Sequence, residues 1–253
     1  MPLVDTDAIV LHAFDYLETS RILRLATRDA GVQSVLAKGA RRARTRHSSA
    51  IDLFAEGSAQ FSLRPGRDLQ TLTGFDVTRV RVGLAADLAR FSAASAIAEL
   101  VLRFGNDEAQ PELFVLLASV LDALAVASAA DARGVALGGA WRLVAAFGFA
   151  PSLDLCARCL APMPDDVAAT FSHREGGVLC DACARGTSAV RLLPLSARRA
   201  ILAWLADSES GPLDDPSLRA HQRLLREFVH EHLTDGRPLR AWDSWEKASW
   251  AGG

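Results

Sequence analysis

The four cysteines of this chain fall within one stretch of 28 residues, and their spacing limits the possible folds more than any other feature of the sequence. They form two CxxC pairs, Cys156 with Cys159 and Cys180 with Cys183, which are separated by 20 residues. Each pair can present two thiolates from one side of a tight turn, and two pairs together complete the tetrahedral shell that structural zinc favours. Four thiolates leave no open position for water, so we expect one structural zinc ion per chain and no metal-based catalysis.

Disulfides, redox chemistry and inert thiols all fit these cysteines less well than zinc does. Two disulfides are disfavoured in a reducing cytoplasm, and a redox-active CxxC usually begins a helix in an α/β domain, which the neighbouring residues do not indicate. The segment between the pairs holds Pro162, Pro164 and Gly176-Gly177 and has too few apolar residues for a core, which argues against inert thiols. His173 lies in the same segment, and we expect a solvated loop residue rather than a ligand. The sequence therefore predicts a four-cysteine zinc ribbon at residues 153–186.

Short apolar runs separated by turn residues characterise the first 82 residues, which we expect to form one domain. One turn is Asp29 to Gly31, and another is Arg64 to Asp68, where Pro and Gly supply the backbone angles of a reversal. The runs predict strands at residues 8–11, 21–27, 32–37, 57–63 and 69–77. Five such strands are typical of an OB-fold β-barrel, which binds strands of nucleic acid across one face. An SH3-like barrel fits the strand count almost as well.

From Leu84 onward apolar residues recur at helical spacing, so residues 83–253 are expected to be α-helical apart from the zinc element. The expected helices are at residues 84–105, 111–129, 134–149, 196–206 and 216–233. The fold class is therefore α+β and multi-domain. The apolar run at residues 113–129 contains Asp122 and is shorter than the roughly 20 apolar residues that a membrane span needs. Because residues 1–13 do not resemble a secretory leader, we expect a cytoplasmic protein with no membrane partner.

Positive charge is concentrated near the start of the chain, although the whole chain has a formal net charge of −2. Residues 1–82 contain 12 lysines and arginines against nine acids. Five of these cations lie within nine residues that contain no acid: Lys38, Arg41, Arg42, Arg44 and Arg46. Further cations that could line the same barrel are Arg64, Arg67, Arg79 and Arg81. Because arginine binds phosphate bidentately, this arrangement favours contact with a nucleic-acid backbone; the alternative is an ordinary solvated face.

Aromatic residues that could stack on bases are few in the predicted barrel, and several must belong to its core. They are Phe14, Tyr16, Phe54, Phe61 and Phe75. Backbone contact with little sequence preference is therefore better supported than base stacking.

Residues that would carry catalysis are not evident in this sequence. The acid pairs Asp5 with Asp7 and Asp165 with Asp166 could suggest a metal-dependent nuclease, but surface solubility explains them better than an open metal site does. The phosphate-binding motif GxxxxGK[ST] is also missing, which disfavours ATP-driven action. We therefore expect no catalytic residues and no enzyme activity.

Two segments resemble the bacterial RecO family of DNA repair proteins. The first holds Ala8-Ile9-Val10-Leu11, then Glu18 to Leu23, and then Ala37-Lys38-Gly39-Ala40-Arg41-Arg42 followed by Leu53-Phe54. The second holds Cys156-Ala157-Arg158-Cys159 and Gly176 to Cys183, set between helices as in that family. The chain departs from the family at Leu160, where glycine is common after the second cysteine, and at Thr45, where serine is usual. Neither change removes a zinc ligand.

The resemblance implies a DNA-binding recombination mediator in DNA repair that acts in the cytoplasm at the nucleoid. It implies binding to single- and double-stranded DNA, annealing of complementary strands, partnership with RecR, and binding to the C-terminal tail of single-strand-binding protein. With these partners, the protein would assist recombinase loading onto coated strands. The alternative function is an OB-fold and zinc-ribbon module that binds RNA or acts in translation. Comparing the affinities for DNA and RNA strands of equal length separates the two functions.

Overall fold

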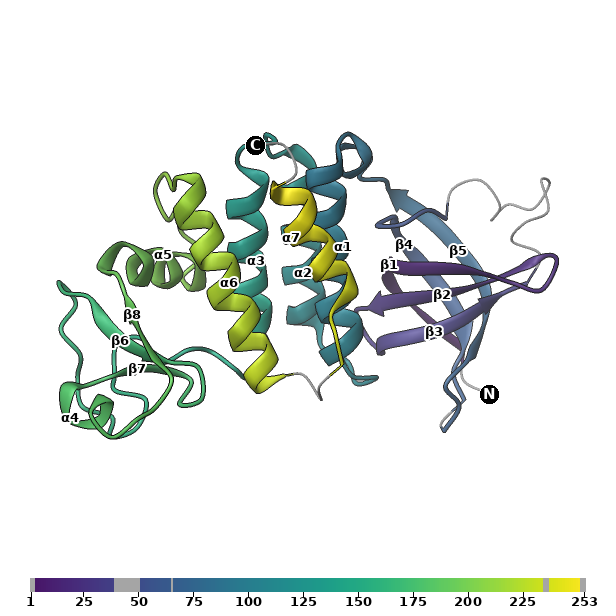
Figure 1. The fold of residues 1–253 in the computed structure, drawn as a ribbon. Coiled ribbons are helices and arrows are strands. Elements are labelled where there is room, and N and C mark those ends of the chain that lie inside the picture. Colours follow the sequence, from purple (N-terminus) through teal and green to yellow (C-terminus); the bar gives the residue numbers. More distant parts are fainter. Residues whose placement is uncertain (1–2, 39–50, 65, 234–236, 251–253) are drawn as a thin grey trace. The chain divides into compact units, whose positions relative to one another are not determined.

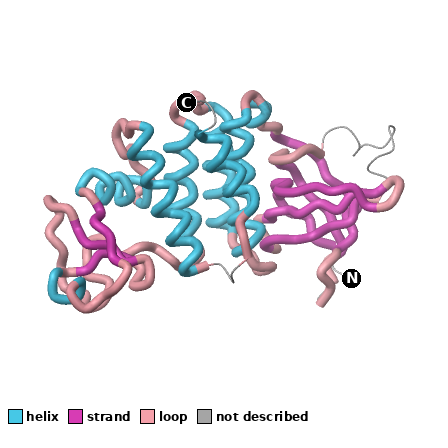
Figure 2. Tube along the Cα trace, viewed as in Figure 1, coloured by secondary structure: helices cyan, strands magenta, loops and turns pink. Residues whose placement is uncertain are grey.

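The computed structural model describes residues 3–38, 51–64, 66–233 and 237–250. The chain forms two compact units. The first contains residues 1–132 and 240–253, and the second contains residues 133–239. Figure 2 shows strands and helices in both units, in agreement with the predicted α+β class.

Within the described residues, the first unit begins with a closed barrel of five strands: β1 (Leu3–Tyr16), β2 (Ser20–Thr27), β3 (Gly31–Ala37), β4 (Glu56–Ser62) and β5 (Gln70–Arg79). Their order around the barrel is β1-β2-β3-β5-β4, and β1 closes it by pairing with β4 (Figure 1). The β3–β5 pair is parallel, whereas the other pairs are antiparallel. This order is that of an OB-fold and not the meander of an SH3-like barrel, so the predicted fold is confirmed.

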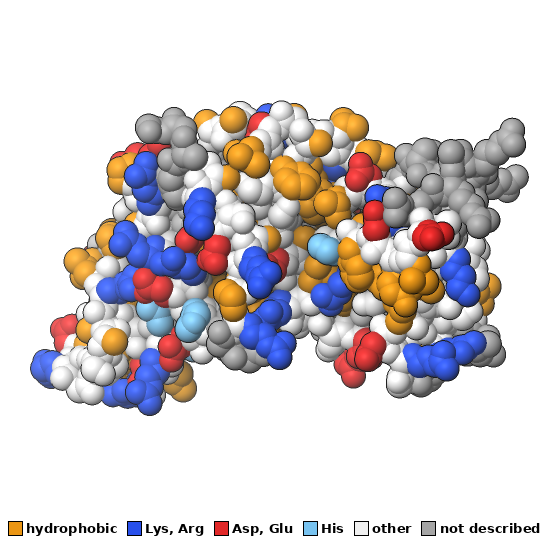
Figure 3. Space-filling view, turned by 45° about the vertical axis from the view of Figure 1, so that its right-hand side comes forward, with side chains coloured by type: hydrophobic (Ala, Val, Ile, Leu, Met, Phe, Trp, Pro, Cys, Tyr) orange, Lys and Arg blue, Asp and Glu red, His pale blue; other side chains and the backbone are white. Residues whose placement is uncertain are grey.

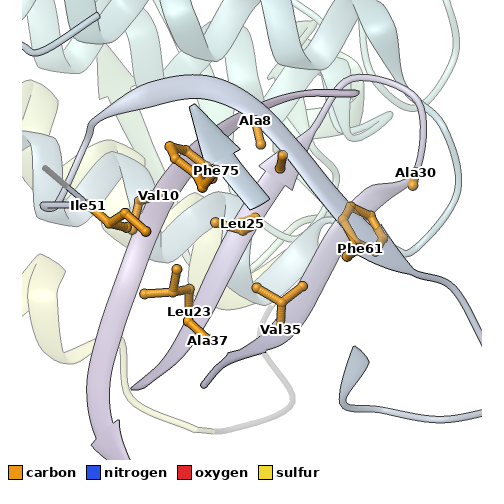
Figure 4. Packing of buried hydrophobic residues seen from close by; sticks show 11 residues of the cluster. Ala8, Val10, Leu23, Leu25, Ala30, Val35, Ala37, Ile51, Phe61 and Phe75 are labelled. Carbon is orange, nitrogen blue, oxygen red and sulfur yellow. The ribbon is translucent and has the colours of Figure 1, made fainter. Parts of the chain in front are cut away.

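Alternating apolar residues build the barrel core. Val10, Leu25 and Val35 are fully buried, and Phe61 and Phe75 join them from β4 and β5 (Figure 4). The predicted turn between β2 and β3 is present, and Gly31 there has a φ of +60° and touches the backbone carbonyl of Asn106. A side chain at this position would clash, because a Cβ atom would lie 2.4 Å from that oxygen. Glycine at position 31 therefore allows the β2–β3 turn to contact the backbone at Asn106.

Besides the barrel, the described part of the first unit contains three α-helices: α1 (Leu88–Phe104), α2 (Pro111–Val126) and α7 (Arg240–Trp250), with a short 3-10 helix η1 (Val82–Ala85) before α1. The side chain of Arg24 on β2 donates a hydrogen bond to the carbonyl of Leu102 on α1, over 3.1 Å. The C-terminal end of α1 therefore covers part of the outer barrel surface. None of the helices among the described residues is long and apolar enough to cross a membrane.

The second unit contains α3 (Ala132–Ala146), α5 (Leu195–Leu205) and α6 (Asp215–His232), together with a small sheet and the short helix α4 (Asp181–Ala184). The sheet has the order β7-β6-β8, built from β6 (Ala169–Ser172), β7 (Gly177–Leu179) and β8 (Val190–Leu193). Phe171 of this sheet is fully buried and lies 6.3 Å from the ring of Phe228 on α6. The helices thus supply a core for the cysteine-bearing segment.

Several elements differ from the sequence-based expectations. The helix α7 was not predicted, although Trp242 and Trp245 are each 1% exposed and give it a firm apolar contact. Strand β1 runs from Leu3 to Tyr16, whereas the sequence predicted a strand at residues 8–11 only. A bulge between Val10 and His12 breaks the alternation of apolar residues, which explains why the second half of the strand was not predicted. The ribbon sheet gains a third strand, β8, beyond residue 186.

Candidate metal centre and nucleic-acid interface

The four cysteines converge, as their spacing predicts. Their sulfur atoms all lie within 4.8 Å of one another, and the Sγ atoms of Cys159 and Cys180 are 3.8 Å apart. A tetrahedral zinc ion with bonds of about 2.3 Å places its sulfur ligands about 3.8 Å apart. All four cysteines are free thiols in this structure, so the disulfide alternative does not hold. The donor set and its spacing fit a four-thiolate zinc site.

Backbone hydrogen bonds shape the first cysteine turn. The N–H of Leu160 donates to the carbonyl of Cys156 over 2.9 Å, and the N–H of Cys156 donates to the carbonyl of Ala161 over 2.8 Å. Leu160 adopts a φ of +61°, the left-handed region in which glycine is favoured. This conformation explains why glycine is common at this position in the family, and leucine adopts it at some cost in strain. The second pair lies on the short helix α4, where Cys180 is the N-cap and Cys183 follows one turn later.

The thiols differ in acidity. Burial opposes ionisation of Cys156, but the backbone groups of Cys159, Cys180 and Arg158 outweigh it and lower its pKa to about 6. Hydrogen bonding to Cys180, followed by burial, raises the pKa of Cys183 to about 12. Four thiolates at this spacing repel one another unless a cation lies between them. A divalent cation would hold all four deprotonated.

His173 is not the solvated residue that the sequence suggested. Its Nε2 atom lies 3.1 Å from a carboxylate oxygen of Glu227, and its ring packs edge-on against Phe171. Burial is the main reason that its pKa is lowered. His173 therefore belongs to the contact between the ribbon and α6, and it is not part of the cysteine cluster.

The barrel exposes two aromatic side chains on one strand. Phe14 and Tyr16 are 43% and 41% exposed, whereas Phe54, Phe61 and Phe75 are buried. Ala13 packs against the barrel core, so the residues on either side of it, Phe14 included, point outward. The ring of His12 lies 5.7 Å from that of Phe14. Figure 3 shows hydrophobic side chains gathered beside a histidine on the barrel surface.

The outward side chains of His12, Phe14 and Tyr16 are called the aromatic face below. They oppose Arg24, Ile22 and Ser20 on β2 in the strand register. Leu17 follows at the tip of the β1–β2 turn and is 75% exposed. An OB-fold holds oligonucleotides across its second and third strands, between the β1–β2 and β4–β5 loops. The aromatic face lies on β1, next to β2 and the β1–β2 turn.

The predicted DNA-binding cations that the structure describes lie at two places on the barrel. Lys38 is exposed and directly follows β3, and since Ala37 pairs with Arg21 it lies near the β1–β2 turn. Arg64 and Arg67 lie instead in the β4–β5 loop, which Gln70 ties down by accepting from the N–H of Arg64 and donating to both arginine carbonyls. The remaining predicted cations, Arg41, Arg42, Arg44 and Arg46, lie outside the described residues.

Two further cations, Arg79 and Arg81, form ion pairs with a helix of the same unit. The side chain of Arg81 is 2% exposed and donates to Glu56 over 2.5 Å, to Asp122 over 2.7 Å and to the carbonyl of Phe54 over 2.9 Å. Arg79 pairs with the same Asp122. Both arginines therefore join the barrel to α2. Arg81 is buried and does not line the barrel surface, whereas the side chain of Arg79 stays 53% exposed.

Comparison with known proteins agrees with this architecture. A family model described as recombination protein O N terminal matches residues 1–81, and one described as recombination protein O C terminal matches residues 85–242. The chain belongs to the RecO family. It is 39% identical over 251 residues to the DNA repair protein RecO of Anaeromyxobacter sp. (strain K), with 95% of each chain covered. The identity is 35% over 228 residues with that of Geobacter sulfurreducens, covering 85% of this chain and 91% of the relative.

The relatives carry the description DNA repair protein RecO. The boundary between the two matching family models lies at the end of the barrel, where β5 gives way to η1. Sequence reasoning missed the exposure of Phe14 and Tyr16 in this RecO barrel. The alternation of His12, Phe14 and Tyr16 was a weak signal, because the bulge before His12 separates it from the alternation of the buried residues upstream.

Proposed function

We propose that this chain is a DNA-binding recombination mediator. It binds single- and double-stranded DNA, anneals complementary strands, and assists recombinase loading onto strands coated by single-strand-binding protein. The observation that carries this proposal is the OB-fold barrel with an exposed aromatic pair at the β1–β2 turn, close to the exposed Lys38, in a chain of the RecO family. Aromatic rings stack on bases without regard to sequence, and cations follow the phosphates.

The parts of the chain divide the work. Residues 1–82 form the DNA-binding domain, with Lys38, Arg41, Arg42, Arg44, Arg46, Arg64 and Arg67 as phosphate contacts. Residues 83–253 form the helical domain that contains the zinc element, and there the four cysteines hold one structural zinc ion. The chain works in the cytoplasm at the nucleoid, with RecR and the C-terminal tail of single-strand-binding protein as protein partners. Family membership supports these two partners.

The rival function is an RNA-binding module on the same scaffold. The relatives are described as DNA repair proteins, which favours DNA over RNA as the ligand. Affinities for DNA and RNA strands of equal length and sequence separate the two proposals, since a translation-associated module would prefer RNA.

The aromatic face gives a direct test. Replacing Phe14 and Tyr16 with alanine should weaken binding of single-stranded DNA by about tenfold for each ring lost, because base stacking contributes about 1–3 kcal/mol per base. Binding of duplex DNA should change little, since stacked base pairs do not offer their faces. Fluorescence anisotropy with labelled single- and double-stranded oligonucleotides measures both affinities.

Leu3→Ala is the matched control, because Leu3 is an exposed apolar residue at the other end of the same strand. Phe14→Tyr and Tyr16→Phe keep the rings and should keep the affinity. Equal weakening of single-stranded and duplex binding would show that the aromatic face does not stack on bases.

A further inference from the structure

An exposed leucine lies in the β1–β2 turn. Leu17, Glu18 and Thr19 form this turn between Tyr16 and Ser20, which pair with each other across the two strands. The side chain of Leu17 is 75% exposed. Figure 1 shows the turn at the end of the barrel that points away from the helices of the first unit. Leu17 therefore lies at the surface, outside the barrel core.

The backbone of Leu17 makes its exposure unusual. Its φ is +54°, in the left-handed region where a residue with a Cβ atom is strained and glycine is favoured. Phe54 has a φ of +64°, but its side chain is 3% exposed and its ring packs against that of Phe91, so burial offsets the strain. Leu17 has no such burial. Because strained residues cluster at sites that contact a ligand, the strained and exposed leucine points to such a site.

The turn continues the aromatic face of β1. Phe14, Tyr16 and Leu17 are three exposed aromatic or apolar side chains within four residues. The intervening Asp15 forms an ion pair with Arg21 over 3.1 Å. A DNA strand whose bases stack on Phe14 and Tyr16 would therefore meet Leu17 beside them.

The charges of the turn favour bases over phosphates as the groups that Leu17 contacts. The turn contains the exposed acid Glu18 and no cation. A carboxylate repels phosphates, whereas the apolar side chain of Leu17 suits the uncharged face of a base. Leucine is among the apolar residues that DNA-binding proteins place against stacked bases.

The end of a duplex suits a single leucine better than an interior base step does. Inserting a side chain between two stacked base pairs requires unstacking them, and the burial of one leucine does not exceed that cost. The last base pair of a duplex has one free face, and covering this face needs no unstacking. Where a single strand continues from the duplex, the free face lies beside the first unpaired base.

We propose that Leu17 packs against the last base pair at a junction of single- and double-stranded DNA while the aromatic face holds the single strand. This inference rests on the proposed function, because it assumes that the aromatic face binds single-stranded DNA. It names the DNA structure that the site prefers, a duplex with a single-stranded tail. Such a junction is present at the end of a duplex that grows by annealing.

The test compares two labelled DNA probes on the full chain. One is an oligothymidylate of about 8 nucleotides, within the site size of one OB-fold. The other is a stem-loop that carries the same oligothymidylate as a tail, so its only free base-pair face is at the junction. The tail is placed at the 5′ end in one version and at the 3′ end in another, and the version that binds more tightly is used. Fluorescence anisotropy gives the dissociation constants.

Leu17→Gly removes the side chain and suits a positive φ. It should weaken binding of the tailed stem-loop by about fivefold, as expected for a leucine that is about half covered, and leave the affinity for oligothymidylate unchanged. Leu17→Met keeps an apolar side chain and should keep most of the affinity for the stem-loop. Because glycine relieves the strain, the unfolding temperature should not fall, which separates a lost contact from lost folding.

Leu160→Gly is the matched control. Leu160 is also an exposed leucine with a positive φ, at 67% and +61°, but it lies in the first cysteine turn of the second unit. Its replacement should change neither affinity. A 2-aminopurine in the last base pair of the stem reports on the contact itself. Its emission should change when the wild-type and control proteins bind, and should change much less with Leu17→Gly.

The outcomes separate this inference from the proposed function. An unchanged affinity of Leu17→Gly for the tailed stem-loop, or an equal loss for both probes, would overturn the junction contact and leave DNA binding by the barrel standing. An equal loss for the stem-loop in Leu160→Gly would also overturn it. A wild-type chain that binds neither probe would refute the proposed function itself.

Discussion

Replacing Cys156 and Cys180 with serine should lower the zinc content of the purified chain from one ion to less than about a tenth of an ion. Two thiolates remain, and two ligands do not hold a structural zinc ion. Structural zinc contributes about 10–16 kcal/mol of apparent binding free energy in small zinc domains. Its loss should therefore unfold both cysteine turns. Atomic absorption on the dialysed protein measures the zinc content.

The unfolding should stay local, because the ribbon has a second anchor. Phe171 is buried beside Phe228, and the buried Arg198 of α5 donates a hydrogen bond to the carbonyl of Pro164. Hydrogen exchange should accelerate in the segments around Cys156 and Cys183, while α6 and the barrel stay protected. DNA binding by the barrel should survive.

A control and a second route keep this prediction decisive. Arg158→Ala removes the ion pair with Glu175, which spans 2.6 Å in the same ribbon, but leaves all four thiols. It should retain zinc. Chelation of the wild-type protein should reproduce the exchange pattern of the serine variant. Stoichiometric zinc in the serine variant would contradict the four-thiolate site.

Replacing Arg41, Arg42 and Arg44 with alanine should weaken binding to every DNA sequence alike. Each phosphate contact contributes about 0.7 to 0.9 to the slope of log affinity against log salt, so three lost contacts reduce the slope by about two. Over a fourfold rise in salt, the wild-type affinity should then fall about 16-fold further than that of the variant. Anisotropy titrations at several salt concentrations give both slopes.

A variant with three exposed arginines of the second unit replaced by alanine, Arg174, Arg185 and Arg199, is the control of equal charge. Its slope should match that of the wild type. If the Arg41, Arg42 and Arg44 variant shows an unchanged slope as well, this basic run is only a solvated face and the barrel draws its affinity from other contacts.

The sequence predicted the barrel because turn residues interrupt its apolar runs at short intervals. The order of the strands around the barrel could not be predicted in this way. Strand β3 pairs with β5, and the two strands are far apart in the sequence, so no local pattern of residues indicates the pair. The aromatic face was missed for a local reason. Val10 and Ala13 both point into the barrel core although they are three residues apart, because the bulge lies between them. A regular two-residue alternation from Val10 would have placed Phe14 in the core instead of on the surface.

Charge was the least predictable property at the level of single residues. Arg64 and Arg81 are equivalent in the sequence, yet one lies in the β4–β5 loop and the other is buried among Glu56, Asp122 and the carbonyl of Phe54. Asp122 lies 41 residues after Arg81 in the sequence, so no local pattern of residues predicts their contact. The clustering of the four cysteines was predictable because a structural zinc ion needs all four thiolates around it.

Annealing of complementary strands tests the central claim most directly. Labelled complementary oligonucleotides, either bare or coated with single-strand-binding protein, are mixed with the chain without nucleotide or added metal, and pairing is followed by fluorescence. The account predicts faster pairing of both bare and coated strands, because binding energy alone drives the reaction. If only bare strands pair faster, the chain does not bind the C-terminal tail of single-strand-binding protein. Pairing that requires ATP, or cleavage of the strands, would contradict the mediator function.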